Sequence, residues 1–293
     1  MPNPPNYVEK SNPYADNWGP FRPGEREKLE QWRRIYYAMT ANLDWNVGRL
    51  MDVLDAAGQR QNTVLVFTSD HGEMLGAQGL KKKNVFFEEA ARIPFLMRMP
   101  GALPAGSVSD ACLGTVDILP TLLSMLGLGI PAEVEGMDLS KAARGERCAE
   151  PEAALLQNIG ACAAWKNGHE WRAVRDKRYT YARYRVDGNE MLFDNQADPY
   201  QINNLAKDKA YRDTLGRLRA FVRARIQAIV DTKEKSTWHR DHWIEDRWIT
   251  QGARGDPAYG LARGGGIRHD TVRPRGEHGC TALRRGSVPG ALS

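Results

Sequence analysis

The sequence predicts an α/β fold in its first half, followed by a smaller α+β unit with an antiparallel sheet. From Glu25 to Leu126 the hydrophobic pattern runs in the order helix, strand, helix, strand, helix. That order is typical of a largely parallel sheet covered by helices. After a polar, glycine-containing stretch around 135–150, the pattern changes to short strands separated by turn residues. We therefore predict an α/β domain over residues 1–150 and a small α+β domain over residues 151–246.

The first predicted helix runs from Glu25 to about Ala57, after a segment (residues 1–24) whose Pro, Asn and Gly content predicts an extended surface stretch. Its apolar side chains recur at steps of three and four residues, which is the spacing of one helix face. These side chains are Leu29, Trp32, Tyr36, Met39, Leu43, Val47, Leu50 and Leu54. Gly58 follows as a C-cap glycine.

The next elements are short and alternate between strand and helix. Residues 63–69 contain a continuous apolar run of β-forming residues, which predicts a strand buried on both faces of a sheet. A short helix is predicted over about 86–92 and a second strand over 94–99, where Pro-Gly ends it. A further amphipathic helix is expected over about 116–126.

The second half of the chain reads as a sheet followed by a helix. Residues 171–184 (WRAVRDKRYTYARY) and 190–194 are predicted to be antiparallel strands. Asp187-Gly188 between them is a hairpin turn signal. Residues 208–230 then show the period of an amphipathic helix.

The formal net charge of +5 comes from one end of the chain. From Arg247 onward there are eight arginines against three acidic residues, so the rest of the chain is neutral overall. That end also holds ten glycines and few aromatics, a composition that cannot bury a core. We predict a disordered tail over residues 247–293 and expect no nucleic-acid partner, because the tail lacks the aromatic interleaving of such modules.

Other global features exclude further classes. No stretch approaches the roughly 18 apolar residues of a membrane span, so no membrane partner is expected. Four scattered cysteines form neither a disulfide framework nor a CxxC zinc pattern. The N-terminus lacks the layout of a signal peptide, and the sequence leaves the compartment open between cytoplasm and periplasm.

Two side chains of types that bind metal ions follow the first predicted strand. Asp70 and His71 would lie at its carboxyl end, which is where ligands bind in open α/β sheets. A carboxylate beside an imidazole suits metal coordination. The alternative is that Asp70 caps a helix and His71 is an ordinary surface histidine.

The stretch around these residues resembles the sulfatases of the alkaline phosphatase superfamily. SDHGEMLG, then Lys83, Glu88 and Arg92-Ile-Pro before the second strand, is similar to a characteristic sulfatase block. The similarity continues through TVDILPTLLSMLGL and EGMDL, and through MLFDNQADPYQINNLA in the second half. It covers roughly residues 1–230 in the family's order. It implies an incomplete alkaline-phosphatase-like α/β/α sandwich with a small C-terminal domain.

The resemblance also implies roles for particular residues. Asp70 and His71 fall where the family places two ligands of its divalent cation, usually calcium. Because imidazole is a poor calcium ligand, manganese, magnesium and zinc remain alternatives. Lys83 falls on the lysine that contacts the sulfate group, whereas a plain reading of Lys81 to Lys83 is a solvated basic run. Gln78 stands where many relatives have a histidine, and Lys81 where an aromatic is common.

The family also carries two elements that we expect to be missing here. One is an N-terminal pair of aspartates that completes the metal site. The other is a cysteine in Cys-x-Pro-x-Arg or Cys-x-Ala-x-Arg that is oxidised to formylglycine, the catalytic nucleophile. Only a Pro-rich segment precedes the long helix, so we expect the chain to be a sulfatase's C-terminal portion, inactive by itself. Cys280 spells the second pattern, but in the tail and out of order, as expected of a chance match.

The sequence therefore predicts a fragment of a sulfuric ester hydrolase, whose complete form would hydrolyse a small-molecule sulfate monoester. Two alternatives stay open. One is a phosphate or phosphonate ester hydrolase of the same superfamily, and the other is a non-catalytic remnant or binding protein. If part of the central sheet is missing, an apolar strand edge would also be open to self-association.

Overall fold

The computed structural model describes residues 3–8, 12–14, 24–158, 170–185, 187–229 and 231, and the backbone of 244–245 and 248–249. All of these belong to one compact unit, Met1–Ala253. Among the described residues, no helix combines the length and apolar character needed to cross a membrane. The predicted tail lies almost wholly outside the described residues, and the domain boundaries stay predictions.

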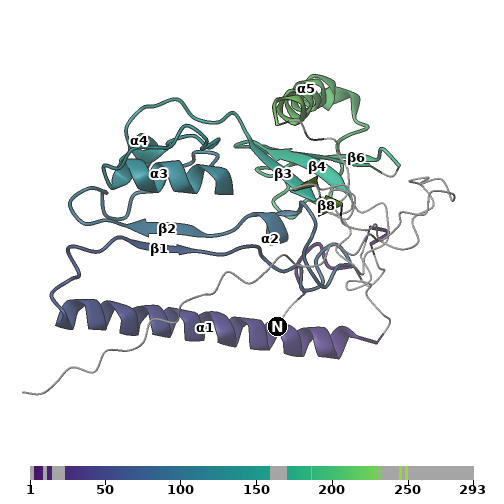
Figure 1. The fold of residues 1–293 in the computed structure, drawn as a ribbon. Coiled ribbons are helices and arrows are strands. Elements are labelled where there is room, and N and C mark those ends of the chain that lie inside the picture. The colour runs from purple at the N-terminus through teal and green to yellow at the C-terminus, as the bar shows by residue number, and fades with distance from the viewer. Residues whose placement is uncertain are drawn as a thin grey trace, which may run out of the picture. The chain divides into compact units, whose positions relative to one another are not determined.

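The first part of the chain has the predicted alternation of helices and strands (Figure 1). Its elements are α1 (Arg26–Ala56), β1 (Leu65–Thr68), α2 (Glu88–Ala91), β2 (Phe95–Arg98), η1 (Thr115–Asp117), α3 (Ile118–Met125) and α4 (Ser140–Ala143). Gly58 follows α1 with a positive φ of 64°, as expected for a glycine at a helix C-terminus. Figure 1 shows β1 and β2 between α1 on one side and α3 and α4 on the other.

The predicted parallel relation between the first two strands is wrong. β1 pairs with β2 in antiparallel register, from Leu65 opposite Arg98 to Thr68 opposite Phe95. Two parallel neighbouring strands need a long crossover connection, usually a helix, that returns the chain to the end of the sheet at which the first strand began. The connection here contains only α2, a single turn, so the chain comes back in the opposite direction. The prediction that this strand is buried on both faces is also wrong, because no residue of β1 is fully buried. Among the described residues β1 pairs with no other strand, and self-association through that edge stays a prediction.

The second part forms a four-stranded antiparallel sheet in the order β3-β4-β5-β6. Its elements are β3 (Ala154–Asn158), β4 (Trp171–Arg175), β5 (Tyr179–Tyr184), β6 (Glu190–Asp194), η2 (Lys209–Tyr211) and α5 (Arg212–Ala228). The two-residue strands β7 (Ile244–Glu245) and β8 (Trp248–Ile249) follow. The antiparallel prediction is confirmed, but the segment 171–184 is two strands. Asp176 ends the first strand by accepting hydrogen bonds from the backbone N–H groups of Arg178 and Tyr179.

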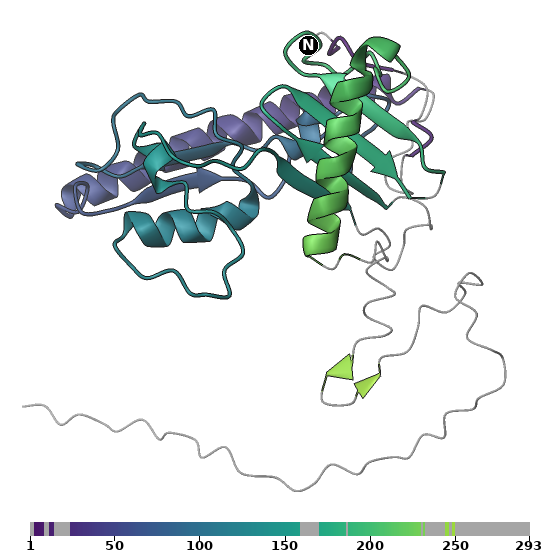
Figure 2. The same ribbon diagram turned by 90° about the horizontal axis from the view of Figure 1, so that it is seen from above.

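This sheet carries a hydrophobic core on each face, because successive side chains of a strand point to opposite sides. On one face Val174, Tyr181 and Leu192 pack against Leu218 and other apolar residues of α5, which crosses the strands in Figure 2. On the other face the core contains Ala173, Ala182 and Phe193 of the sheet and residues 74–90. The segment that links β1 to α2 is therefore held by the small sheet.

The apolar face of α1 is only partly covered. Leu29 is buried, yet many of the other apolar side chains on the helix are exposed. These include Trp32, Tyr36, Met39, Leu43 and Leu50. Their periodicity predicted the helix correctly, although this part of its apolar face is exposed.

Candidate functional site

Asp70 and His71 lie directly beyond the end of β1, as predicted. The strand ends at Thr68, and the hydroxyl of Ser69 donates a hydrogen bond of 2.8 Å to the carbonyl of His71. The Asp70 side chain is 82% exposed and that of His71 36% exposed. The backbone N–H of His71 holds the pKa of the Asp70 carboxyl below its ordinary value. The carboxylate is therefore charged and open to a ligand.

The two side chains present complementary metal-binding atoms. Nδ1 of His71 lies 2.7 Å from the carbonyl oxygen of Gly72. Because a carbonyl oxygen can only accept, Nδ1 carries the proton of that hydrogen bond, which leaves the lone pair of the neutral ring on Nε2. Nε2 in turn lies 3.2 Å from Oδ2 of Asp70. A nitrogen lone pair and a carboxylate oxygen this close could share one divalent cation.

The backbone around this pair is tightly packed at Gly72. Its N–H donates a hydrogen bond of 2.9 Å to the carbonyl of Ala90 at the end of α2. A Cβ atom at this position would overlap the carbonyl oxygen of Glu89. Glycine is thus required by close backbone approach, and α2 fixes the turn that carries His71.

The structure places Lys83 in the same electrostatic neighbourhood as His71. Burial raises the pKa of the Glu73 carboxyl, and Lys82, Lys83 and His71 all oppose that rise. Lys83 is half-buried, whereas Lys82 is exposed. Glu73 was not among the predicted site residues. In the sequence, only its position two residues after His71, in SDHGE, connects Glu73 with the site. Nothing in that position indicates that its side chain is partly buried.

The residue after Lys83 is firmly held by the small sheet. The carbonyl of Asn84 accepts hydrogen bonds from the indole of Trp171 at 3.0 Å and from the side chain of Asn158 at 3.1 Å. Phe86 and Phe87 follow and are almost completely buried. The backbone that carries Lys83 is therefore anchored immediately downstream, which restricts where its ammonium group can reach.

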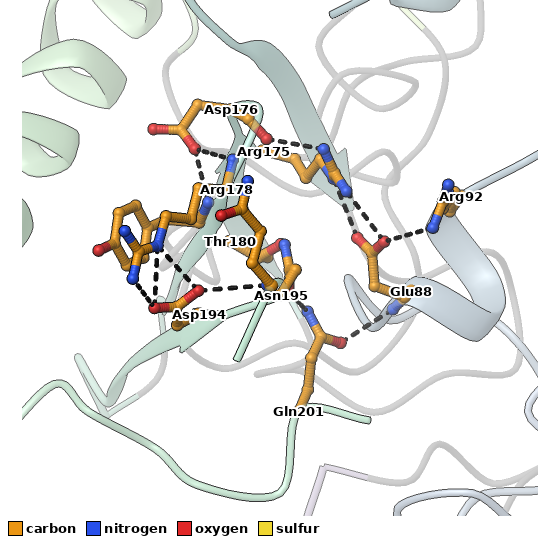
Figure 3. Close-up of polar contacts among 11 residues, drawn as sticks. Glu88, Arg92, Arg175, Asp176, Arg178, Thr180, Asp194, Asn195 and Gln201 are labelled. Carbon is orange, nitrogen blue, oxygen red and sulfur yellow. Dashed lines mark hydrogen bonds and ion pairs between the residues drawn. The ribbon is translucent and has the colours of Figure 1, made fainter. Parts of the chain in front are cut away.

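A polar network at the start of α2 strengthens this anchor (Figure 3). Arg175 of β4 donates to both carboxylate oxygens of Glu88, at 3.1 and 3.2 Å. The backbone N–H of Glu88 donates to Oε1 of Gln201, which is buried, and Nε2 of Gln201 donates to Asn195. Arg92 also faces Glu88, but at 3.8 Å and 74% exposed.

Arg175→Ala is expected to lower the free energy of unfolding by about 1–3 kcal/mol, because Glu88 would keep a largely buried carboxylate without its bidentate partner. Arg92→Ala is the matched control: it removes an exposed charge from the same carboxylate and should cost less than about 0.5 kcal/mol. Urea denaturation of both variants, with the Glu88→Ala/Arg175→Ala cycle, measures the coupling. Equal losses in the free energy of unfolding for Arg175→Ala and Arg92→Ala would contradict the expectation that Glu88 depends mainly on Arg175.

The two departures from the family pattern have contacts inside the chain. Nε2 of Gln78 donates to the backbone carbonyls of Tyr200 and Gln201, at 3.0 and 2.9 Å. Nζ of Lys81 lies 2.8 Å from a carboxylate oxygen of Glu25, and its side chain is 10% exposed. The three lysines in sequence therefore differ in environment, which the sequence did not reveal.

Among the described residues, no third His, Cys, Asp or Glu joins Asp70 and His71 in a group that could hold a metal ion. The pair alone supplies two of the ligands that a divalent cation needs, since calcium takes about six to eight and magnesium about six. Further ligands would have to come from other groups or from water.

Two family models match the chain. The one described as Sulfatase matches residues 2–128, and the one described as N-sulphoglucosamine sulphohydrolase, C-terminal, matches residues 76–228. Asp70, His71 and Lys83 all lie within the first match.

Individual proteins show the same similarity. An ulvan-active sulfatase of Formosa agariphila is 37% identical over 77% of this chain and 43% of its own length. A solved structure described as in complex with its substrate, D-glucosamine-2-N,6-O-disulfate, has a TM-score of 0.64 at 28% identity, over 71% of this chain and 43% of that one. The phosphonate monoester hydrolase of Agrobacterium radiobacter has a TM-score of 0.61 at 29% identity, over 69% and 42%. The chain thus spans less than half the length of each.

Proposed function

The chain belongs to the sulfatase family of the alkaline phosphatase superfamily, and from that membership we propose that the complete protein hydrolyses a sulfate monoester. The observation that carries the proposal is the convergence of Asp70 and His71 directly after β1, in a segment that the sulfatase model covers. Sulfated sugars are the first substrates to test, because the names of the relatives point to sulfated carbohydrates.

The family uses a divalent metal, and the donor set of Asp70 and His71 fits one. The carboxylate supplies a hard oxygen, and the hydrogen bond from Nδ1 to Gly72 leaves Nε2 as the donor nitrogen. We propose calcium, with manganese, magnesium or zinc as alternatives. When bound, the cation would stabilise negative charge on the sulfate oxygens during cleavage of the S–O bond.

Lys83 is proposed to contact the sulfate group. Its ammonium would add a fixed positive charge beside the non-bridging oxygens, and the anchor at Asn84 would hold its backbone in place. Asp70 and His71 would hold the metal and take no proton themselves. The proposed nucleophile is a formylglycine in the part of the relatives' length that this chain does not span.

The test starts from the DNA upstream of the Met1 codon. An in-frame Cys-x-Pro-x-Arg or Cys-x-Ala-x-Arg would allow expression of the extended protein and assays with chromogenic sulfate, phosphate and phosphonate esters. We expect sulfate ester turnover that falls at least 100-fold in Asp70→Ala and in Lys83→Ala. Lys82→Ala is the matched control and should retain most of the activity, because Lys82 is exposed.

Other outcomes decide between the alternatives. A preference for the phosphonate ester would favour the alternative of a phosphonate ester hydrolase, which is also the activity named for one structural relative. An extended protein with the nucleophile motif but no turnover of any ester would contradict the proposal. Equal losses in Lys82→Ala and Lys83→Ala would contradict the role given to Lys83.

A further inference from the structure

A cavity of about 450 Å³ lies between α5 and the sheet face that α5 covers. None of the residues proposed for sulfate cleavage is among the described residues that line it. Aromatic side chains line part of it, among them Tyr181. The volume lies within the range of sites for small molecules, about 300–1,000 Å³.

The charge of this cavity is strongly one-sided. Among the described residues that line it, one is acidic, Glu190, and five are arginines. The five are Arg172, Arg183, Arg185, Arg219 and Arg223. They come from two strands, the turn after β5 and a helix, so the fold gathers them from separate parts of the sequence.

Two carboxylates near the cavity are already engaged. Both oxygens of Glu190 accept from the guanidinium of Arg219, and one of them also accepts from the hydroxyl of Tyr181. Asp231 accepts two hydrogen bonds from the buried side chain of Arg172. These two carboxylates therefore already neutralise two of the five arginines.

Two other arginines of the cavity, Arg183 and Arg223, are less fully neutralised. Arg183 of β5 lies between Arg172 of β4 and Glu190 of β6 in register, and Glu190 is shared with Arg219. Arg223 projects from α5 into the same cavity. Neither Arg183 nor Arg223 has an ion pair with any described residue. An anion bound by both guanidinium groups would complete their neutralisation, and guanidinium groups suit oxyanions because they can donate two parallel hydrogen bonds.

We propose that this cavity binds a tetrahedral oxyanion, with Arg183 and Arg223 as its direct ligands. The anion is either a free inorganic ion or the sulfate group of a sugar, since both present the same oxygens. The volume exceeds that of one such ion. The site is independent of the proposed function, because it requires neither the metal nor the nucleophile.

The experiment is a calorimetric titration of the 293-residue chain with sodium sulfate and with a disulfated glycosaminoglycan disaccharide, at constant ionic strength. Sodium chloride and the unsulfated disaccharide are the reference ligands. We expect one saturable site for the sulfated ligands and none for the references. Tighter binding of the sulfated disaccharide by tenfold or more would identify the sugar as the source of the anion, and equal or tighter binding of sulfate would identify the free ion.

Variants locate the site. Arg183→Gln/Arg223→Gln is expected to weaken binding at least tenfold while far-UV circular dichroism stays unchanged. Arg225→Gln removes an exposed charge from the same helix, outside the cavity lining, and should change binding less than twofold. The proposal is overturned if sulfate binds no better than chloride, or if the double variant and Arg225→Gln weaken binding equally. If the double variant unfolds, the single variants Arg183→Lys and Arg223→Lys must each weaken binding for the proposal to stand.

Discussion

Phe86→Ala is expected to lower the free energy of unfolding by about 3–5 kcal/mol, a large loss for the truncation of a single side chain. The Phe86 ring is completely buried in the core beneath the small sheet. It lies 4.7 Å from the ring of Phe87, and makes edge-on contacts at 5.4 Å with Trp171 and 5.9 Å with Tyr184. Truncation would remove these contacts and leave a cavity that a close-packed interior cannot fill.

Urea denaturation followed by far-UV circular dichroism measures this loss. The control is Tyr37→Ala, which removes an aromatic ring that is 57% exposed on α1 and should change stability by less than about 0.5 kcal/mol. A loss below about 1 kcal/mol for Phe86→Ala would show that the segment carrying Lys83 is not anchored by this core. A loss of the expected size should also loosen the backbone at Lys83, three residues upstream.

The elements that local pattern determines were predicted well. α1, β6 and α5 lie within a few residues of their predicted bounds, because helical and strand periods are properties of consecutive residues. The direction of β2 relative to β1 depends on the connection between them and on which strands pair with each strand. The hydrophobic pattern of consecutive residues contains no information on either. The missed strand β3 has only two large apolar residues, Leu155 and Leu156, so its period was too weak to recognise.

The location of Asp70 and His71 in the fold was predicted, but the contacts that support the loop around them were not. A strand that precedes the two residues is visible in the sequence, and the structure places both directly beyond its end, although none of the residues of β1 is fully buried. The bond between Glu88 and Arg175 joins residues 87 positions apart, and no local pattern indicates such a pair. Similarly, Lys81 and Lys83 are equivalent in sequence, and only the fold shows that Lys81 is committed to Glu25.

Residues 1–293, expressed by themselves, are expected to hydrolyse no chromogenic sulfate ester above the blank, with calcium or manganese added. Covalent catalysis needs an activated nucleophile. Within these residues only Cys280 stands in a family nucleophile pattern, and it lies outside the described residues. Calcium prefers about six to eight ligands, whereas no further His, Cys, Asp or Glu among the described residues joins Asp70 and His71.

Three variants of the same chain make that assay decisive. Turnover that disappears in both Asp70→Ala and Cys280→Ala would contradict the expectation and identify Cys280 as a nucleophile. Turnover that requires Asp70 but not Cys280 would indicate a metal-activated water instead. Lys82→Ala controls for a general loss of positive charge in the loop. We expect no measurable turnover in the parent chain or in any variant. Residual catalysis without a nucleophile depends on a preorganised set of charges around the reacting group, and residues 1–293 supply only part of that set.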